Sequence, residues 1–213
     1  MRSMKFAVCL AKAARKVAAC RDELCQLDTF IGDGDHGITV ERGFLAAADA
    51  AETLDGPIDH LFLNIGSSMS RAMGGAIGPL YGVFWSAVAA GSRDATGIQA
   101  SLFAQAIAAG VENVMRVGKA NEGDKTLVDA MAPCARAMLE AAETEPLAIV
   151  IERGAKAAAQ GSLATQNMIA RKGRARFLGD KSLGYIDPGA ASFAIFMEAL
   201  AQTIKTEEDI QNS

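Results

Sequence analysis

The sequence predicts an all-α fold, on three observations. Half of the 213 residues are hydrophobic and alanine supplies much of that half, a composition that favours helix. Apolar residues recur at helical spacing in segments of ordinary helix length. The regular alternation of apolar and polar residues that would indicate strands is missing. Because aromatic residues make up only 6% of the chain, we expect a core of close-packed small side chains.

Eight helices are predicted in order, separated by glycine, proline or acidic loops. The first is amphipathic, because basic residues interrupt its apolar stretch, and it does not resemble a signal peptide. The best strand candidate, LAIVIE at 147–152, continues into RGAKAAAQ and indicates a buried helix beginning near Pro146. The polar end, from about residue 206 to 213, is expected to fray. The predicted helices span 5–26, 37–52, 57–72, 77–91, 97–117, 124–142, 147–168 and 188–205.

The length suits one large domain, or at most two small ones, and a single domain over residues 1–213 is expected. Composition also excludes several classes of protein. The net charge of −4 and the pI of about 5.3 give no sign of a nucleic-acid partner. No apolar run is long enough to span a bilayer, so no membrane is expected. Free thiols without metal-finger or C-x-x-C spacing predict a cytoplasmic chain. They are interpreted as small buried hydrophobic residues: Cys9, Cys20, Cys25 and Cys134.

Four stretches interrupt the helical pattern with glycine, aspartate, lysine or arginine. In an all-helical domain such loops can meet at one end and form a site. The last of them carries a run of cations before a turn and helix entry, and these cations either bind phosphate or form a solvated face. The four stretches are 28–37, 73–79, 118–126 and 171–189.

The acidic stretch IGDGDHGITVERGF, with the aspartate just before it, predicts a metal site. Asp33 and Asp35 leave an extended segment on the same side, and Asp28 is within reach. Converging carboxylates are tolerated when a divalent cation neutralises them, and oxygen ligands suit Mg²⁺ or Ca²⁺. An EF-hand is excluded, because Gly37 and Phe44 would stand at ligand positions. The alternative is a solvated turn in which Asp33 or Asp35 caps the next helix.

Two further features favour an anionic ligand, each with a plainer alternative. The helix that starts near Gly37 offers unpaired N–H groups to a polyphosphate. His36 beside it either bonds a phosphate or belongs to the helix cap. The glycine-rich segment at 72–82 is not a Walker A loop. It either brings a ligand close to bare backbone or lines a helix crossing, and the segment 118–130 is either a third site loop or a simple helix entry.

Taken together, four motifs resemble the L subunit of dihydroxyacetone kinase, its nucleotide-binding subunit. They are LDTFIGDGDHGITVERGF, GGAIGPLYG, GDKTLVDAMAP and ARKGRARFLGDKSLGYIDPGAASF, in the family's order between residues 27 and 193. The resemblance implies a barrel of eight antiparallel helices with the nucleotide–metal site at one end. It also implies two Mg²⁺ ions on the phosphates of ADP or ATP, held by Asp28, Asp33 and Asp35.

The resemblance also implies which residues contact the nucleotide, with a possible electrostatic role for Arg174 in catalysis. Two positions depart from the family pattern. Ile77 stands where the family commonly has serine, and Thr39 where it commonly has asparagine, which leaves a related ketose open as the substrate. The implied contacts are His36, Gly37, Ile38, Thr39, Ala76, Ile77, Gly118, Leu127, Arg174, Asp187, Pro188 and Gly189.

The implied activity is phosphoryl transfer from the Mg²⁺-bound nucleotide to dihydroxyacetone, or a related short ketose, held covalently on a separate K subunit. A chain of the free-standing subunit's length favours a relay, in which a phosphotransferase-system phosphocarrier (the M subunit) rephosphorylates bound ADP, over exchanging ATP. The alternative function is a nucleotide-binding regulatory module that contacts a transcription factor without turnover. A homodimer also stays open.

Overall fold

The computed structural model of the protein describes residues 1–53, 56–93 and 95–211. These residues form nine α-helices and two 3₁₀-helices and no strand, which confirms the predicted all-α fold. The helices are α1 (Ser3–Ala18), α2 (Arg21–Ile31), α3 (His36–Glu52), α4 (Ile58–Ala72), α5 (Ile77–Gly91), α6 (Ala100–Gly118), α7 (Val128–Ala141), α8 (Leu147–Ala164), η1 (Thr165–Asn167), η2 (Ala175–Ser182) and α9 (Pro188–Gln211).

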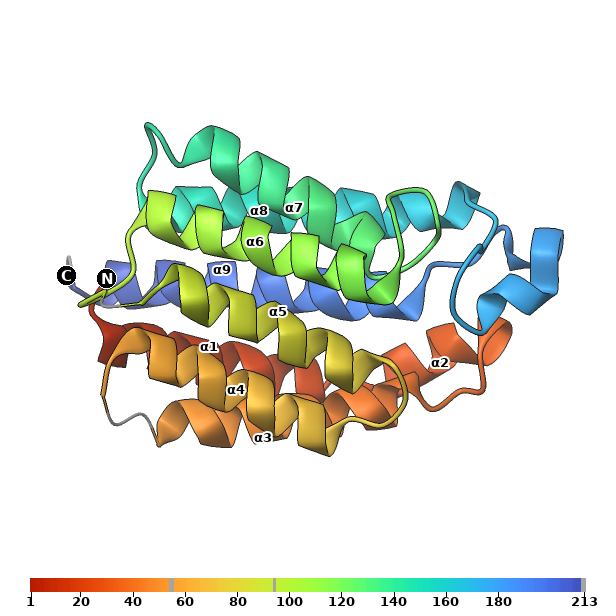
Figure 1. The fold of residues 1–213 in the computed structure, drawn as a ribbon, viewed down its shortest axis with the longest axis horizontal. Coiled ribbons are helices and arrows are strands. Elements are labelled where there is room, and N and C mark those ends of the chain that lie inside the picture. The colour runs from red at the N-terminus through yellow and green to blue at the C-terminus, as the bar shows by residue number, and fades with distance from the viewer. Residues whose placement is uncertain (54–55, 94, 212–213) are drawn as a thin grey trace.

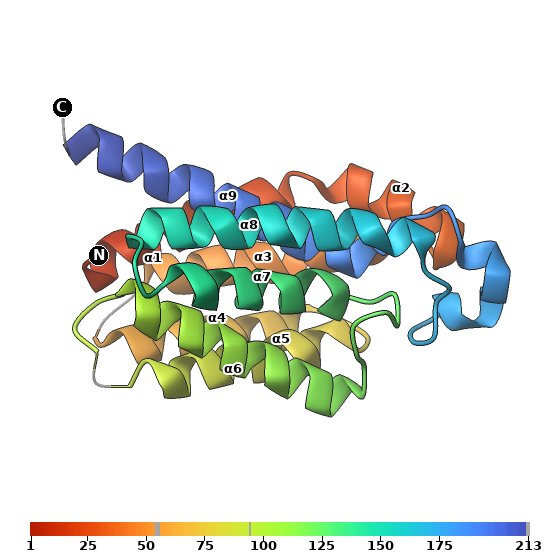
Figure 2. The ribbon, with the colours of Figure 1, turned by 90° about the horizontal axis from the view of Figure 1, so that it is seen from above.

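Eight of the helices close a barrel. From α3 to α9 each helix packs against the next along the chain, and α1 packs against both α3 and α9. Figures 1 and 2 show that neighbouring helices run antiparallel along the long axis of the molecule. The short α2 stands at one end of this ring, where it contacts α3, α9 and η2. The barrel of eight antiparallel helices that the resemblance implied is therefore present.

The predicted first helix, 5–26, is two helices in the structure. α1 ends at Ala18 and α2 begins at Arg21, and the backbone amide of Cys20 donates to the carbonyl of Val17. Neither glycine nor proline marks this break in the sequence. The apolar pattern continues because α2 also buries one side, packed across the barrel end. Its buried residues are Leu24, Asp28 and Ile31.

Two other boundaries differ from the prediction. The helix expected from residue 124 begins at Val128, because Lys125 has a φ of 58° and cannot be part of a right-handed helix. α9 continues to Gln211, through most of the tail that was expected to fray. The last two residues of that tail lie outside the described part of the chain.

The barrel interior is aromatic, with small residues around the rings. Phe6 lies edge-on to Phe103 with ring centroids 5.1 Å apart, and Phe62 stacks on Trp85 at 5.5 Å. All the phenylalanines except two near the α2 end are buried. The expectation of a core of small side chains therefore holds only in part. The few aromatic residues gather inside the barrel, and the alanines pack between them.

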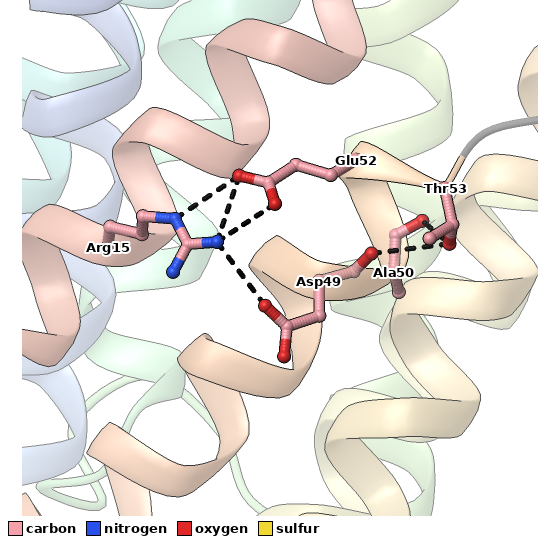
Figure 3. A network of polar contacts seen from close by, with 5 residues as sticks. All are labelled: Arg15, Asp49, Ala50, Glu52 and Thr53. Carbon is pink, nitrogen blue, oxygen red and sulfur yellow. Dashed lines mark hydrogen bonds and ion pairs between the residues drawn. The ribbon is translucent and has the colours of Figure 1, made fainter.

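Ion pairs join helices on the outer surface. Arg15 of α1 donates to both carboxylate oxygens of Glu52 at 2.9 Å and to Asp49 of α3 at 3.3 Å (Figure 3). Because these side chains are exposed and water screens their charges, the network contributes little to stability. Among the described residues, no helix combines the length and the apolar character that crossing a membrane requires.

Candidate functional site

Antiparallel alternation places the N-termini of α3, α5, α7 and α9 at the same end of the barrel (Figure 1). The segments that lead into these helices are 32–35, 73–76, 119–127 and 168–187, so the four stretches identified in the sequence meet there. Residues from all four line a cavity of about 710 Å³, a size typical of small-molecule sites. Since helix N-termini carry positive partial charge, this end of the barrel favours an anion.

Three carboxylates gather at the wall of this cavity. Asp28 lies in the last turn of α2, and Asp33 and Asp35 lie in the turn between α2 and α3. One carboxylate oxygen from each lies within 4.8 Å of the other two. The close approach requires glycine at position 32, because a Cβ on Gly32 would lie 1.9 Å from Asp28 Oδ1. Hard oxygen ligands at this spacing suit Mg²⁺ or Ca²⁺.

Asp28 also orders the turn that carries the other two carboxylates. Its Oδ2 accepts the backbone N–H of Asp35 at 3.1 Å and that of His36 at 3.2 Å. The predicted alternative had Asp33 or Asp35 as the capping side chain. In the described structure Asp35 occupies the N-cap position of α3 but its side chain makes no capping hydrogen bond. The exposed carboxylates of Asp33 and Asp35 are therefore oriented toward other partners.

Arg174 brings a positive charge to the acidic turn. Its guanidinium pairs with Asp33, and Nη1 lies 4.0 Å from an oxygen of Asp35. Arg174 precedes η2, in the basic segment between α8 and α9. The segment is thereby folded over the carboxylates, and the repulsion among them is partly offset.

His36, the first residue of α3, connects the acidic turn to α9. Its Nε2 lies 3.1 Å from the hydroxyl of Ser192, which in turn donates to the carbonyl of Gly189 at 3.0 Å. Burial lowers the pKa of His36 to about 4, against the opposing effect of the Asp28 carboxylate. The ring is therefore neutral at pH 7, and one of its nitrogens is committed to the contact between α3 and α9.

The loop before α5 exposes bare backbone to the cavity. Apart from each glycine and its two chain neighbours, no atom of the described residues lies within 4 Å of the position that a Cβ would take on Gly74 or Gly75. Gly75 has a φ of 65°, which a side chain would disfavour. α5 begins at Ile77, and no side chain in the described structure caps its first turn. The amides at this helix start can therefore bind an anion without help from a hydroxyl group.

Another part of the cavity wall is apolar. Leu80 of α5, Val114 and Val117 of α6, and Leu127 before α7 contribute to it. Gly118 lies beside Leu80, and a Cβ added to Gly118 would lie 3.3 Å from a methyl group of Leu80. A cavity with an apolar wall, uncapped amides and a carboxylate cluster suits a ligand that has a flat apolar part and an anionic part.

A family model described as the DAK2 domain matches residues 30–202. The chain belongs to the DAK2 domain family. Its relatives include the ADP-binding subunit DhaL of the PEP-dependent dihydroxyacetone kinase of Escherichia coli (strain K12). The two are 33% identical, over 85% of this chain and 88% of the relative. The resemblance to the L subunit of dihydroxyacetone kinase is thus confirmed.

Other relatives include a protein of similar length and a much longer one. The ADP-binding subunit DhaL of PEP-dependent dihydroxyacetone kinase 1 from Listeria innocua serovar 6a is 38% identical over 84% of this chain and 86% of the relative. L-erythrulose 1-kinase of Mycolicibacterium smegmatis is also 38% identical, over 84% of this chain. The chain spans only about a third, 32%, of the length of that kinase.

Solved structures with the same fold come from the dihydroxyacetone kinase of C. freundii. The native form has a TM-score of 0.74 and 23% identity, covering 93% of this chain and 34% of that one. The complex of that kinase with AMP-PNP and Mg²⁺ has a TM-score of 0.72 and 25% identity, covering 92% and 33%. The barrel is thus the fold of the matched part of that kinase.

Most residues that the resemblance assigned to the DAK2 site line the cavity, but Gly37 and Ile38 are not among its lining residues. Gly37 is buried against α2, where a Cβ would lie 1.9 Å from the carbonyl of Arg21. Its position therefore serves the close packing of α3 on α2. The assigned residues that line the cavity are Asp28, Asp33, Asp35, His36, Thr39, Ala76, Ile77, Gly118, Leu127, Arg174, Asp187, Pro188 and Gly189.

Several residues that line the cavity of this DAK2 domain were not identified from the sequence. Arg42 lines the cavity with Asp35 and Thr39, and their spacing of four and three residues on one helix could have identified it. Lys125 was expected in the first turn of a helix and instead lies in the loop before α7. The apolar wall could not be separated from core positions, because both follow the same helical period.

Proposed function

We propose that this chain is the nucleotide-binding subunit of a kinase, which holds a Mg²⁺–nucleotide complex and presents its terminal phosphoryl group to a short ketose on another protein. The observation that carries the proposal is the carboxylate cluster of Asp28, Asp33 and Asp35, within 4.8 Å of one another at a cavity of about 710 Å³. Metal ligands beside helix N-termini are a suitable seat for a polyphosphate.

The donor chemistry of the carboxylate cluster suits Mg²⁺, and the proposed number of ions is two. All three ligands are hard oxygen donors, and Asp28 is held by two backbone amides while its second oxygen faces Gly32. When bound, Mg²⁺ neutralises phosphate charge and orients the terminal phosphoryl group. The helix N-termini make this end of the barrel suited to anions, and yet three carboxylates gather there. A requirement for a metal cation explains the combination, because the cation would neutralise the carboxylates.

The remaining residues of the site would bind and orient the nucleotide. The apolar wall of Leu80, Val114 and Val117 suits the base, and the amides at the start of α5 suit the phosphates. Arg174, already beside the carboxylates, would supply positive charge to the phosphoryl group during transfer. No residue of this chain needs to act as a nucleophile.

The departures at Ile77 and Thr39 are compatible with this arrangement. Ile77 is half-buried at the first position of α5 and follows an open glycine backbone. Backbone amides can therefore serve the phosphates where the family commonly uses a serine hydroxyl. Thr39 lines the cavity, with a hydroxyl group in its side chain where the family commonly has an amide.

The phosphoryl acceptor would be dihydroxyacetone or erythrulose, held covalently on a K-type subunit. Relatives that share the domain are named as kinases of one or the other ketose. For the donor we propose the relay, in which a phosphotransferase-system protein rephosphorylates ADP that stays bound. Two relatives that this chain matches over most of their length are named PEP-dependent and ADP-binding.

Titration calorimetry with Mg·ADP tests the nucleotide site. Asp33→Asn should weaken binding by about 1 kcal/mol or more, roughly fivefold, because a charged metal ligand is lost. The matched control is Asp22→Asn, which removes a fully exposed carboxylate from the same end of the chain. If Asp33→Asn and Asp22→Asn bind Mg·ADP equally well, the carboxylates do not hold the metal.

Reconstitution tests the reaction. The purified chain alone should not phosphorylate dihydroxyacetone. With the partner subunits of the Escherichia coli kinase, the phosphotransferase-system proteins that accept the phosphoryl group from PEP, and PEP itself, it should turn over. Mass analysis should find ADP retained by the purified protein. Turnover driven by ATP without PEP would overturn the relay. Mg·ADP binding with no turnover under any condition would instead identify a nucleotide-binding regulatory module.

A further inference from the structure

Lys125 is the most unusual side chain at the cavity end of the barrel. Its exposed fraction is 1%, although lysine is among the residues least often buried. Its backbone has a φ of 58°, in the left-handed region that residues other than glycine rarely adopt. A buried charge on a strained backbone persists only where the surrounding structure holds it in place.

The ammonium group of Lys125 joins two segments that are distant in the sequence. Its Nζ donates to the carbonyl of Thr165 at 2.6 Å and to the carbonyl of Tyr185 at 2.5 Å. Thr165 follows the last turn of α8, where a helix presents carbonyls and negative partial charge. Tyr185 lies three residues before α9. The hydrogen bonds of Lys125 therefore connect the C-terminal end of the basic segment, at Tyr185, to the C-terminal end of α8.

The environment compensates the buried charge. Burial lowers the pKa of Lys125, while the carboxylates of Asp187 and Asp129 act in the opposite direction. Asp129 is itself fixed, since it accepts the backbone amides of Gly123 at 2.5 Å and Thr126 at 2.7 Å. The ammonium group thus sits among carbonyls and carboxylates, as a buried cation requires.

The residues around Tyr185, which Lys125 connects to the end of α8, lead directly into the cavity. The amide of Gly184 donates to the carbonyl of Gln166 at 2.8 Å, and the amide of Asp187 donates to the Thr165 hydroxyl at 2.9 Å. Two residues beyond Tyr185 begins the turn Asp187–Gly189, which lines the cavity together with Arg174 of the same segment. Outside, the Tyr185 ring stacks on Phe30 of α2 with centroids 4.9 Å apart, but both rings are exposed.

We propose that Lys125 is a positioning residue of the nucleotide site: its ammonium group holds residues 183–187 on the end of α8, and so places the turn Asp187–Gly189 and Arg174 against the nucleotide. This inference rests on the proposed function for the identity of the ligand. The position of the segment itself does not depend on any ligand, so the two can be tested separately.

Trypsin reports the position of the segment without a nucleotide. Cleavage in a folded protein follows the population of the open form. Four exposed cleavage sites lie in the basic segment just before residues 183–187, at Arg171, Arg174, Arg176 and Lys181, and release of residues 183–187 would free this segment. Lys125→Met should be cut there about tenfold or more faster than the wild type. The control is Lys119→Met, because Lys119 also has a positive φ, 50°, in the same loop but is exposed.

The Lys119→Met protein should be cut within about twofold of the wild-type rate. Equal cleavage of Lys125→Met and the wild type would overturn the proposal. So would failure of Lys125→Met to form the helical barrel by circular dichroism, since the ammonium would then serve the whole fold rather than this segment.

Mg·ADP affinity and chemical rescue complete the test. Lys125→Met should bind Mg·ADP about tenfold or more weakly, and Lys119→Met should bind like the wild type. For the rescue, Lys125→Cys is made in a background in which the four native cysteines, Cys9, Cys20, Cys25 and Cys134, are alanine, so that bromoethylamine applied to the unfolded chain modifies position 125 alone. After refolding it should recover the trypsin protection and the affinity of the same background with Lys125, while Lys125→Met in that background should not. No recovery in the cysteine variant would refute the role of the ammonium.

The two proposals fail differently. If the wild type does not bind Mg·ADP, the proposed function fails while the trypsin comparison still decides the role of Lys125. If the wild type binds Mg·ADP and Lys125→Met keeps full affinity and full protection, only the positioning role is lost.

Discussion

Replacing Gly32 by alanine should disable the carboxylate cluster without removing a carboxylate. Gly32 has a negative φ, −141°, so the left-handed region that favours glycine is not involved, and the effect considered is the steric contact of the new methyl group. The new Cβ would lie 1.9 Å from Oδ1 and 2.7 Å from Cγ of Asp28. The Asp28 side chain must therefore rotate away, and the turn that it holds must move with it.

The size of the effect follows from the hydrogen bonds of Asp28. Its carboxylate accepts the amides of Asp35 and His36 at 3.1 and 3.2 Å, and losing one hydrogen bond to a charged group costs about 1.5–3 kcal/mol. Because these bonds fix the position of Asp35 relative to Asp28, we expect Mg·ADP binding to weaken roughly 10- to 150-fold. The barrel core is remote from this turn and should stay folded.

A double-mutant cycle measured by titration calorimetry tests this reasoning. Gly32→Ala, Asp28→Asn and the double variant are compared in Mg·ADP affinity and in urea unfolding. If the alanine acts through Asp28, it should add little once Asp28 is already asparagine. Gly32→Ala with wild-type affinity, or with fully additive losses in the double variant, would show that the contact between the two residues is not what holds the site together.

Three further predictions concern the barrel and its surface. Ile77→Ser should leave Mg·ADP affinity unchanged or raise it, because Ile77 is only half-buried and a serine could add one charge-assisted hydrogen bond, about 1.5–3 kcal/mol if well placed. A fall in both affinity and melting temperature would mean that Ile77 is structural. Phe62→Ala should lower the free energy of unfolding in urea by about 3–5 kcal/mol, since the ring is fully buried. Phe177→Ala, which truncates a ring that is 79% exposed, should change it by less than about 0.5 kcal/mol, and similar losses in both would contradict the described core. Burial raises the pKa of the Cys134 thiol, which keeps it protonated, so iodoacetamide at pH 8 should label Cys134 only after unfolding, and rapid labelling of the native protein would contradict its burial.

Much of the fold could be predicted from the sequence, because helix formation is dominated by local signals. Helices α3 to α6 and α8 agree with their predicted ranges within a few residues, and α9 begins at its predicted residue but ends later than predicted. The break at Ala19 and Cys20 escaped prediction, because α1 and α2 each bury one face and the apolar period does not reveal a change of direction. The late start of α7 depends on the left-handed Lys125, which only its buried partners stabilise.

The sequence by itself determined the helical class, the acidic turn and the glycine-rich loops, because helical periodicity, carboxylate spacing and backbone freedom are properties of neighbouring residues. Only the tertiary structure decided which surfaces face one another. It closed the ring through α1 and α9, set the carboxylates within 4.8 Å, and placed an apolar wall and the ammonium of Lys125 at the same end. These features bring together residues that are separated in the sequence by up to about the full length of the chain. Packing across the barrel fixes them, and no local pattern in the sequence records that packing.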